Sequence, residues 1–439
     1  MGKRLYIETW GCQMNRHQSE GIAGVLRRAG YVSVDEIGDA DVVIFNGCMV
    51  RQKAEEKVYG RIGAVVEERR RRPVLLGIGG CLGEIRGKTL LDRFPAVDFV
   101  FGASGHASLP GLIEEATGRS RPVAVGRETI DEVPSLRSSS VTAMVTITEG
   151  CSNFCSYCVV PFARGPMRSR APERICAEVT EAVSAGYREI LLLGQNVNSY
   201  GQDRPAFGDF VSLLRRVAAC GPDRIRFTSS HPRDLSDELL EAMATVDNVC
   251  PHLHVACQSG SDRILAAMNR GYTKERFLER VARARATVPG INVTTDLIVG
   301  FPGESESDFA ASMDLVERVR FGSIFAAKYS PRPGTASARL GDDVSEDVKQ
   351  RRLQTVLERQ RRIALEENER RIGCVVEVLL EGESRSGVHY GRAADHRTVL
   401  AESGAEDLAP GDLVAVRVEA ASSASLSGVA VQSVALGHP

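Results

Sequence analysis

Long hydrophobic stretches are missing from this 439-residue sequence. No apolar run approaches the roughly 20 residues that a membrane-spanning helix needs. The first residues, Met1 to Trp10, also lack the apolar core of a secretory signal. These absences predict a cytoplasmic protein that has no contact with a membrane.

An excess of charge of one sign is missing as well. The chain has 55 Lys and Arg against 57 Asp and Glu, a formal net charge of −2. This balance provides no general attraction for nucleic acid, so any RNA contact must come from local basic patches. With 43% hydrophobic and 26% charged residues, the composition is that of an ordinary soluble protein, long enough for two or three domains.

Cysteine is present in an odd number, 11. In a reducing compartment these residues are not expected to form a disulfide framework, so a clustered subset indicates metal binding or reactivity. Cys151, Cys155 and Cys158 have the spacing C-x3-C-x2-C and follow an alternating run at 144–148 that is typical of a strand. Three ligands are too few for a closed zinc site, which takes four. Three thiolates can instead hold a four-iron cluster with one iron open to a small molecule.

Residues 3–118 alternate strand-like and helix-like patterns, which predicts a parallel sheet covered by helices. Strands are expected at 5–9, 42–46, 74–78 and 98–101. Three of them are followed by the same pair, Gly-Cys, at Cys12, Cys48 and Cys81. Because ligands bind outside the carboxyl ends of such strands, these thiols should meet at one edge and form a second three-thiolate site. The alternative is buried core thiols; a nucleotide-binding turn is excluded because no G-x-G-x-x-G follows these strands.

A linker is predicted at 119–136, and a second α/β region at 137–370. Its six strands, expected at 142–148, 189–193, 224–228, 252–256, 291–299 and 323–328, favour an open partial barrel. The active site of such a barrel lies at the carboxyl ends of its strands. The C-x3-C-x2-C loop follows the first strand, and the loops at 194–196, 229–232, 258–261 and 300–304 follow later ones. All these loops should therefore surround one mouth.

The last part of the chain combines a basic helix with an acidic end. A long helix is expected at 345–372, and residues 349–371 hold eight Lys and Arg against four Asp and Glu. Short strands broken by Gly at 371–435 predict a small β-barrel, yet residues 372–439 hold four Lys and Arg against nine Asp and Glu. Since phosphate contacts need cations, we expect RNA to contact the helix and the cluster of Arg164, Arg168 and Arg170 rather than the barrel. A solvated basic face is the alternative for the helix.

The stretch Gly150–Cys158, on the first strand of a six-unit α/β barrel, resembles the radical S-adenosylmethionine superfamily. The three N-terminal cysteines and the C-terminal barrel, which is similar to a TRAM RNA-binding module, narrow the resemblance to the methylthiotransferases. Within these, the chain resembles the tRNA-2-methylthio-N6-dimethylallyladenosine synthases. The motifs are Gly-Cys-Gln-Met-Asn at 11–15, Gly-Gln-Asn-Val-Asn-Ser-Tyr-Gly at 194–201, Gln-Ser-Gly-Ser at 258–261 and Tyr-Ser-Pro-Arg-Pro-Gly-Thr at 329–335. One departure is Val-Ala-Cys at 255–257, where the family usually has Leu-Pro-Val.

The resemblance implies an α/β enzyme with two [4Fe-4S] clusters and S-adenosylmethionine. The first cluster would bind S-adenosylmethionine, and the second, auxiliary cluster would carry the sulfur. The ligands would be Cys151, Cys155 and Cys158 for the first cluster and Cys12, Cys48 and Cys81 for the auxiliary one. Tyr157 and Gln195 are assigned to the S-adenosylmethionine site. The two clusters would carry the chemistry, so no catalytic side chain is assigned.

The reaction implied is the addition of a methylthio group to C2 of N6-isopentenyladenosine, next to the anticodon of tRNA. An electron donor such as flavodoxin or ferredoxin would serve a monomeric enzyme. Two alternatives of the same class are action on threonylcarbamoyladenosine in tRNA and action on a ribosomal protein. A different class is a non-catalytic iron–sulfur protein that binds RNA or transfers electrons. This class is disfavoured because electron carriers usually complete their clusters with four ligands.

Overall fold

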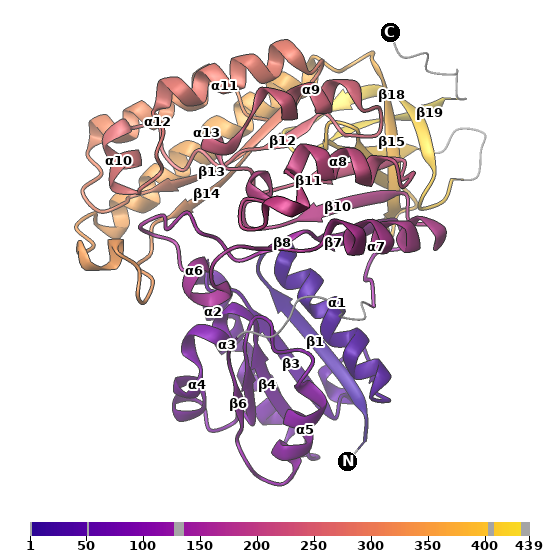
Figure 1. Ribbon diagram of the computed structural model, residues 1–439, viewed down its shortest axis with the longest axis vertical. Coiled ribbons are helices and arrows are strands. Elements are labelled where there is room, and N and C mark those ends of the chain that lie inside the picture. Colours follow the sequence, from indigo (N-terminus) through magenta and orange to yellow (C-terminus); the bar gives the residue numbers. More distant parts are fainter. Residues whose placement is uncertain (1, 51, 127–135, 403–407, 432–439) are drawn as a thin grey trace.

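The computed structural model describes residues 2–50, 52–126, 136–402 and 408–431 (Figure 1). Its N-terminal part is a six-stranded, all-parallel sheet with the order β2-β1-β3-β4-β5-β6. The strands are β1 (Arg4–Trp10), β2 (Val32–Ser33), β3 (Val42–Gly47), β4 (Leu75–Gly79), β5 (Phe99–Phe101) and β6 (Val123–Ala124). The four strands expected from the sequence are all present.

Helices cover both faces of this N-terminal sheet. Along β3, Val42 and Ile44 pack with α1 and α5, whereas Val43 and Phe45 pack with α2, α3 and α4. A strand buried on both faces has a continuous apolar sequence, as β3 does. The helices are α1 (Gln13–Arg28), α2 (Gln52–Glu68), α3 (Gly80–Arg86), α4 (Lys88–Arg93) and α5 (Leu109–Thr117).

The sequence did not predict the two shortest strands of this sheet. β2 and β6 have two residues each, too few for an alternating pattern to be recognised. β6 lies in the stretch expected to be a linker, where Val123 pairs with Val100 of β5. The N-terminal sheet therefore continues into that stretch.

The central part contains the six parallel strands expected of a partial barrel. They form two sheets with the orders β11-β10-β7 and β12-β13-β14, and a parallel bridge between Ser230 and Val255 connects the two. The strands are β7 (Thr142–Thr146), β10 (Glu189–Leu193), β11 (Arg224–Phe227), β12 (His252–His254), β13 (Asn292–Val299) and β14 (Ser323–Lys328). The first strand ends earlier than predicted, because its strand pairing is interrupted at Ile147. The chain continues as β8 (Thr148–Glu149), which pairs with β9 (Arg168–Ser169).

Helices pack outside these strands and enclose one hydrophobic core with them (Figure 1). They are α7 (Pro172–Ser184), α8 (Phe210–Ala218), α9 (Asp237–Thr245), α10 (Asp262–Ala267), α11 (Lys274–Thr287) and α12 (Glu306–Val319). The short α6 (Val160–Arg164) is different. It follows the C-x3-C-x2-C loop and lies between the central part and the N-terminal sheet (Figure 1).

A long helix, α13 (Glu346–Glu369), leads to a closed five-stranded barrel. Val356 and Ile363 of α13 belong to the central hydrophobic core, and Gln360 donates to the carbonyl of Phe321 at 3.0 Å. The barrel strands are β15 (Val375–Glu383), β16 (His389–Ala393), β17 (Thr398–Glu402), β18 (Leu413–Ala421) and β19 (Leu426–Val431). The predicted fold class is thus confirmed: an N-terminal parallel sheet, a central partial barrel and a small C-terminal barrel.

The turn between β16 and β17 docks the C-terminal barrel onto the central part. Arg226 of β11 donates to the carbonyls of Ala393 and Ala394, both at 2.8 Å, and its Nε lies 2.6 Å from Glu189. His396 of the turn stacks on His252 with 4.5 Å between ring centroids. Glu189, Arg226 and His252 lie at or near the amino ends of the central strands β10, β11 and β12. The acidic barrel therefore closes the end of the partial barrel opposite the cysteine loop.

We expect Arg226→Met to loosen this docking. The change leaves Glu189 buried without its cation and the carbonyl of Ala394 without its donor, a loss of about 3 kcal/mol or more. Hydrogen exchange of the amides at 391–399 should become faster, while amides of the N-terminal sheet keep their rates. Arg417→Met is the matched control, because Arg417 lies in the same barrel with a side chain that is 54% exposed. Equal exchange in the two variants would contradict the docking role.

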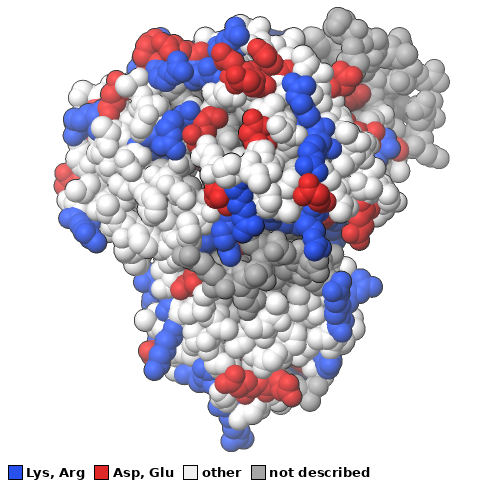
Figure 2. Space-filling view, in the orientation of Figure 1, with Lys and Arg blue, Asp and Glu red and all other residues white. Residues whose placement is uncertain are grey.

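Basic and acidic side chains are interspersed on the face shown in Figure 2, in keeping with the net charge of −2. Much of the charge of α13 is paired within the chain: Lys349 with Asp342, Arg352 with Glu304, and Arg359 with Glu317. No helix among the described residues has the length and apolar character needed to span a membrane.

Candidate active site

Three N-terminal cysteines lie at the carboxyl ends of neighbouring strands. Cys12 follows β1 at the start of α1, Cys48 follows β3, and Cys81 lies in the first turn of α3 after β4. Glycine allows the close approach: Gly80 has φ of +79°, and a Cβ there would lie 2.2 Å from Asn46 Oδ1. Residues that are far apart in sequence are thus brought to one edge of the N-terminal sheet.

The three thiols influence one another electrostatically. A hydrogen bond from Cys48 lowers the pKa of Cys12 to about 5, and the same contact raises the pKa of Cys48. Burial raises the pKa of Cys81, while the nearby guanidinium of Arg164 acts in the opposite direction. One thiol of the group is therefore ready to ionise, and a bound metal would have to deprotonate the other two.

The second group, Cys151, Cys155 and Cys158, lies in a loop that begins directly after β8. The loop is held by backbone contacts: Cys151 N–H donates to Gly165 O, and Cys158 N–H donates to Cys155 O, both at 3.0 Å. Burial raises the pKa of Cys158 to about 12. Arg270, which is only 4% exposed, donates from Nη1 to Cys155 Sγ at 3.3 Å. Sequence reasoning missed Arg270, because nothing local links it to a loop more than a hundred residues away.

Two residues are assigned to the S-adenosylmethionine site. Tyr157 lies in this loop, and Gln195 lies at the same mouth of the partial barrel. Tyr157 is half-buried against an apolar cluster that includes Met268, Phe301 and Tyr329. Gln195 follows β10, and within the described residues neither Oε1 nor Nε2 of its buried amide has a hydrogen-bond partner. A buried amide with no partner is costly, so this side chain is suited to bind a polar ligand.

Two further hydroxyls share this property at neighbouring strand ends. Thr148 Oγ1 on β8 and Ser230 Oγ after β11 are buried and have no hydrogen-bond partner in the part of the chain that the structure describes. Together with Gln195 they form a row of unsatisfied polar groups along the mouth of the partial barrel. Such a row offers hydrogen-bonding groups to a polar ligand.

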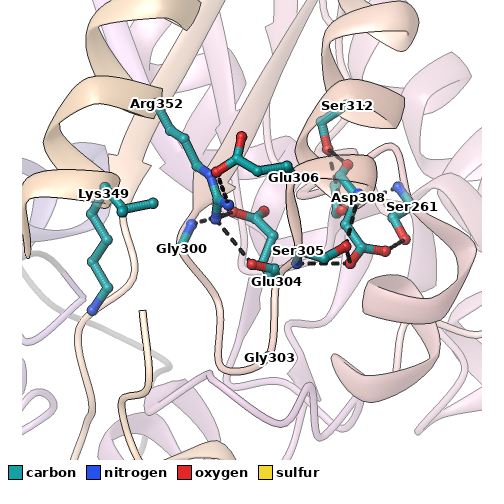
Figure 3. A network of polar contacts seen from close by, with 12 residues as sticks. Ser261, Gly300, Gly303, Glu304, Ser305, Glu306, Asp308, Ser312, Lys349 and Arg352 are labelled. Carbon is teal, nitrogen blue, oxygen red and sulfur yellow. Dashed lines mark hydrogen bonds and ion pairs between the residues drawn. The ribbon is translucent and has the colours of Figure 1, made fainter. Parts of the chain in front are cut away.

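A side chain of α13, Arg352, holds the loop that follows β13 (Figure 3). Arg352 reaches Glu304, with 2.7 Å between Nη1 and Oε2, and also Glu306 at 2.7 Å. The other contact of Glu304 Oε2 is the N–H of Gly300, at 2.7 Å. Burial raises the pKa of Glu304. This network fixes the loop 300–304 at the mouth of the partial barrel.

The arginine cluster that we expected to contact RNA points inward instead. Arg164 lies 3.9 Å from Glu149, and Arg170 lies 2.9 Å from Glu178, with both arginine side chains less than a tenth exposed. They line a cavity of about 60 Å³ between α1 and β7–β8. The expectation is therefore wrong for Arg164 and Arg170, because both side chains are buried and paired with Glu149 and Glu178.

Contacts between the N-terminal and central parts bring the two cysteine groups toward each other. Val159, directly before α6, and Ala163 of α6 pack into the core of the N-terminal sheet. Arg332 lies 3.5 Å from Glu55 and donates to the carbonyl of Val50 at 3.4 Å. The loop of one cysteine group and the strand ends that carry the other are thus parts of one interface.

A single metal ion does not fit either group. Across residues 2–50, 52–126, 136–402 and 408–431, no three His, Cys, Asp or Glu side chains are arranged to hold one ion. A four-iron cluster takes each thiolate on a different iron, so its ligands need not converge on one point. Three cysteines per group fit such a cluster.

Comparison with known proteins agrees with this reading. Residues 145–316 match the model of the radical SAM superfamily, and residues 4–102 match that of the Uncharacterized protein family UPF0004. The chain is 43% identical over 441 residues to the tRNA-2-methylthio-N(6)-dimethylallyladenosine synthase of Carboxydothermus hydrogenoformans, covering 98% of this chain and 99% of the relative. The synthase of Geotalea uraniireducens is 46% identical over 405 residues, 90% and 92% of the two chains.

The chain belongs to the tRNA-2-methylthio-N(6)-dimethylallyladenosine synthase family. The family predicted from the sequence is confirmed, and the radical SAM superfamily implies a [4Fe-4S] cluster and S-adenosylmethionine. Solved structures share the fold of this synthase-family chain. The radical S-adenosylmethionine methyltransferase TsrM of Kitasatospora setae has a TM-score of 0.57 at 14% identity, covering 86% of this chain and 77% of its own. The cobalamin-dependent radical enzyme OxsB has a TM-score of 0.53 at 13% identity, covering 80% and 56%.

Proposed function

We propose that this chain attaches a methylthio group to C2 of N6-isopentenyladenosine, next to the anticodon of tRNA. The observation that carries the proposal is the presence of two three-cysteine groups at the facing strand ends of two α/β parts. Each group has the number of thiolates that leaves one iron of a four-iron cluster open. Relatives that align over almost the whole chain are synthases of the corresponding tRNA product.

Each cysteine group has its own role in this proposal. Cys151, Cys155 and Cys158 hold the cluster next to S-adenosylmethionine, and Cys12, Cys48 and Cys81 hold an auxiliary cluster. When bound, the first cluster would supply the electron that splits one S-adenosylmethionine, the auxiliary cluster would supply the sulfur, and a second S-adenosylmethionine would supply the methyl group.

The remaining work is done by side chains that bind and orient. Gln195, Thr148 and Ser230 offer hydrogen-bonding groups to S-adenosylmethionine, and Tyr157 packs against its adenine. The interface between the two parts keeps water away from the reacting atoms. A flavodoxin or ferredoxin delivers the electron to a monomeric enzyme in the cytoplasm. The parts correspond to the domains expected at 3–118, 137–370 and 371–435, except that β6 (Val123–Ala124) extends the first domain into the stretch 119–136.

The test combines reconstitution with nucleoside analysis. After anaerobic loading with iron and sulfide, the chain should hold about eight irons, from two four-iron clusters. With reductant it should form 5′-deoxyadenosine. Transfer RNA from cells with the gene should contain the methylthio derivative of isopentenyladenosine, which should be missing from cells without the gene.

Other outcomes of this test identify the alternatives. A methylthio group on threonylcarbamoyladenosine, or on a ribosomal protein, would assign the same chemistry to another substrate. Two loaded clusters without any 5′-deoxyadenosine would favour a non-catalytic iron–sulfur protein and contradict the proposal.

A further inference from the structure

Arg164 connects the two cysteine groups physically. It ends α6, six residues after Cys158 in the sequence, yet the neighbouring Ala163 packs in the same hydrophobic cluster as Cys81 of the other group, and the Arg164 charge opposes the burial that raises the pKa of Cys81. Its charge also acts on Cys12. The packing explains this reach, because α6 lies against the N-terminal part (Figure 1), and Ala163 of α6 is buried in the core of that part. The helix that follows the radical SAM loop thereby brings Arg164 close to the N-terminal cysteine group.

The positive charge of Arg164 is only partly balanced by carboxylates. Its side chain is 3% exposed, and its ion pair is the 3.9 Å contact of Nη1 with Glu149 Oε1. Glu149 is shared, because Arg168 lies closer to its other oxygen, at 3.2 Å. Arg164 Nη2 is buried without a hydrogen-bond partner in the described part of the chain. A weakly paired, buried cation thus faces the thiols of Cys12 and Cys81.

The other cysteine group has a matching arginine. Arg270 donates to Cys155 Sγ at 3.3 Å and is equally buried. Its second nitrogen, Nη2, donates to the carbonyl of Ala256 at 2.6 Å, so Arg270 is anchored within its own domain. Arg164 differs because it comes from the opposite domain. Hydrogen bonds and positive charge at ligand sulfurs raise the reduction potential of an iron–sulfur cluster.

We propose that Arg164 is a positioning residue that raises the reduction potential of the cluster held by Cys12, Cys48 and Cys81. This inference rests on the proposed function, which places an auxiliary cluster on those cysteines. Because α6 follows the Cys151–Cys158 loop directly, the reduction potential of the auxiliary cluster depends on how that loop packs against the N-terminal sheet. The arginine thus makes the auxiliary cluster sensitive to the closure of the interface between the two domains.

The test uses the full chain with Cys151, Cys155 and Cys158 changed to Ala, so that any loaded cluster is the auxiliary one. Redox titration followed by electron paramagnetic resonance measures its midpoint potential. Adding Arg164→Met should shift the midpoint to a more negative value at an unchanged iron content of about four per chain. Arg164→Lys, which keeps the charge but loses the planar donor, should fall between the two.

Arg168→Met is the matched control, because Arg168 pairs with the same Glu149 and should leave the potential where it was. An unchanged midpoint in Arg164→Met with the cluster loaded would overturn the inference. If Arg164→Met fails to load iron, the same titration of Arg164→Gln, which removes the charge but keeps a polar side chain, decides: a midpoint equal to that of the parent refutes the role of Arg164. Failure of the parent itself to load about four irons would instead refute the proposed auxiliary cluster.

Discussion

Cys155→Ala is expected to abolish the reductant-dependent formation of 5′-deoxyadenosine. Cys155 lies in the loop after β8 and accepts a hydrogen bond from Arg270. Removing one of three thiolates leaves too few ligands for a four-iron cluster with a single open iron. The iron loaded anaerobically should fall from about eight to about four per chain. Liquid chromatography of the reaction mixture measures the product, and cleavage that survives in this variant would refute the assignment.

Cys12→Ala separates the two cysteine groups. It should leave the formation of 5′-deoxyadenosine in place, because Cys12 belongs to the N-terminal sheet. It should abolish the methylthiolated nucleoside, which depends on the sulfur supplied there. Cys250→Ala is the control for the loss of a buried thiol: Cys250 is 5% exposed and lies in neither group. Both activities should persist in this variant.

Arg352→Met is expected to destabilise the central part of the protein by about 3–5 kcal/mol. Glu304 has a side chain that is 1% exposed, and the substitution removes the only cation paired with it in the described structure. The carboxylate would then remain buried with the N–H of Gly300 as its main partner. Denaturant titration with a fluorescence or circular dichroism signal measures the change.

Arg351→Met is the matched control on the same helix. The Arg351 side chain is 63% exposed and lies 3.5 Å from the exposed Glu306. A surface pair of this kind contributes little, so we expect a change within about 0.5 kcal/mol. Equal effects of the two substitutions would contradict the role of the buried pair.

The deficit of Arg352→Met should depend on pH. Burial already raises the pKa of Glu304 above its ordinary value, and loss of the Arg352 charge raises it further. A raised pKa means that the folded state favours the protonated carboxyl, so stability is lost as the pH rises through that pKa. The deficit should therefore be largest at neutral pH and shrink as the pH falls toward the ordinary range of a glutamate.

Local sequence patterns predicted the elements that carry the cysteines. The apolar runs before Cys12, Cys48 and Cys81 could be read as strands because β1, β3 and β4 are packed into the sheet, and a common Gly-Cys ending indicated a shared edge. The six strands of the central part were found for the same reason. Two-residue strands such as β2 and β6 escaped, since their stability comes from pairing with neighbours and not from their own sequence.

The sequence by itself determined the cysteine groups, the order of the α/β units and the family, because spacing and alternation are local properties of the chain. Only the tertiary structure decided where the charges act. In the sequence, Arg164 and Arg170 indicated an exposed basic patch. In the structure both side chains are buried and paired with Glu149 and Glu178. Arg270 reaches Cys155 across more than a hundred residues, and Arg226 holds the acidic C-terminal barrel. The contacts of Arg270 and Arg226 join residues that are far apart in the sequence, so the packing of whole domains decides their partners.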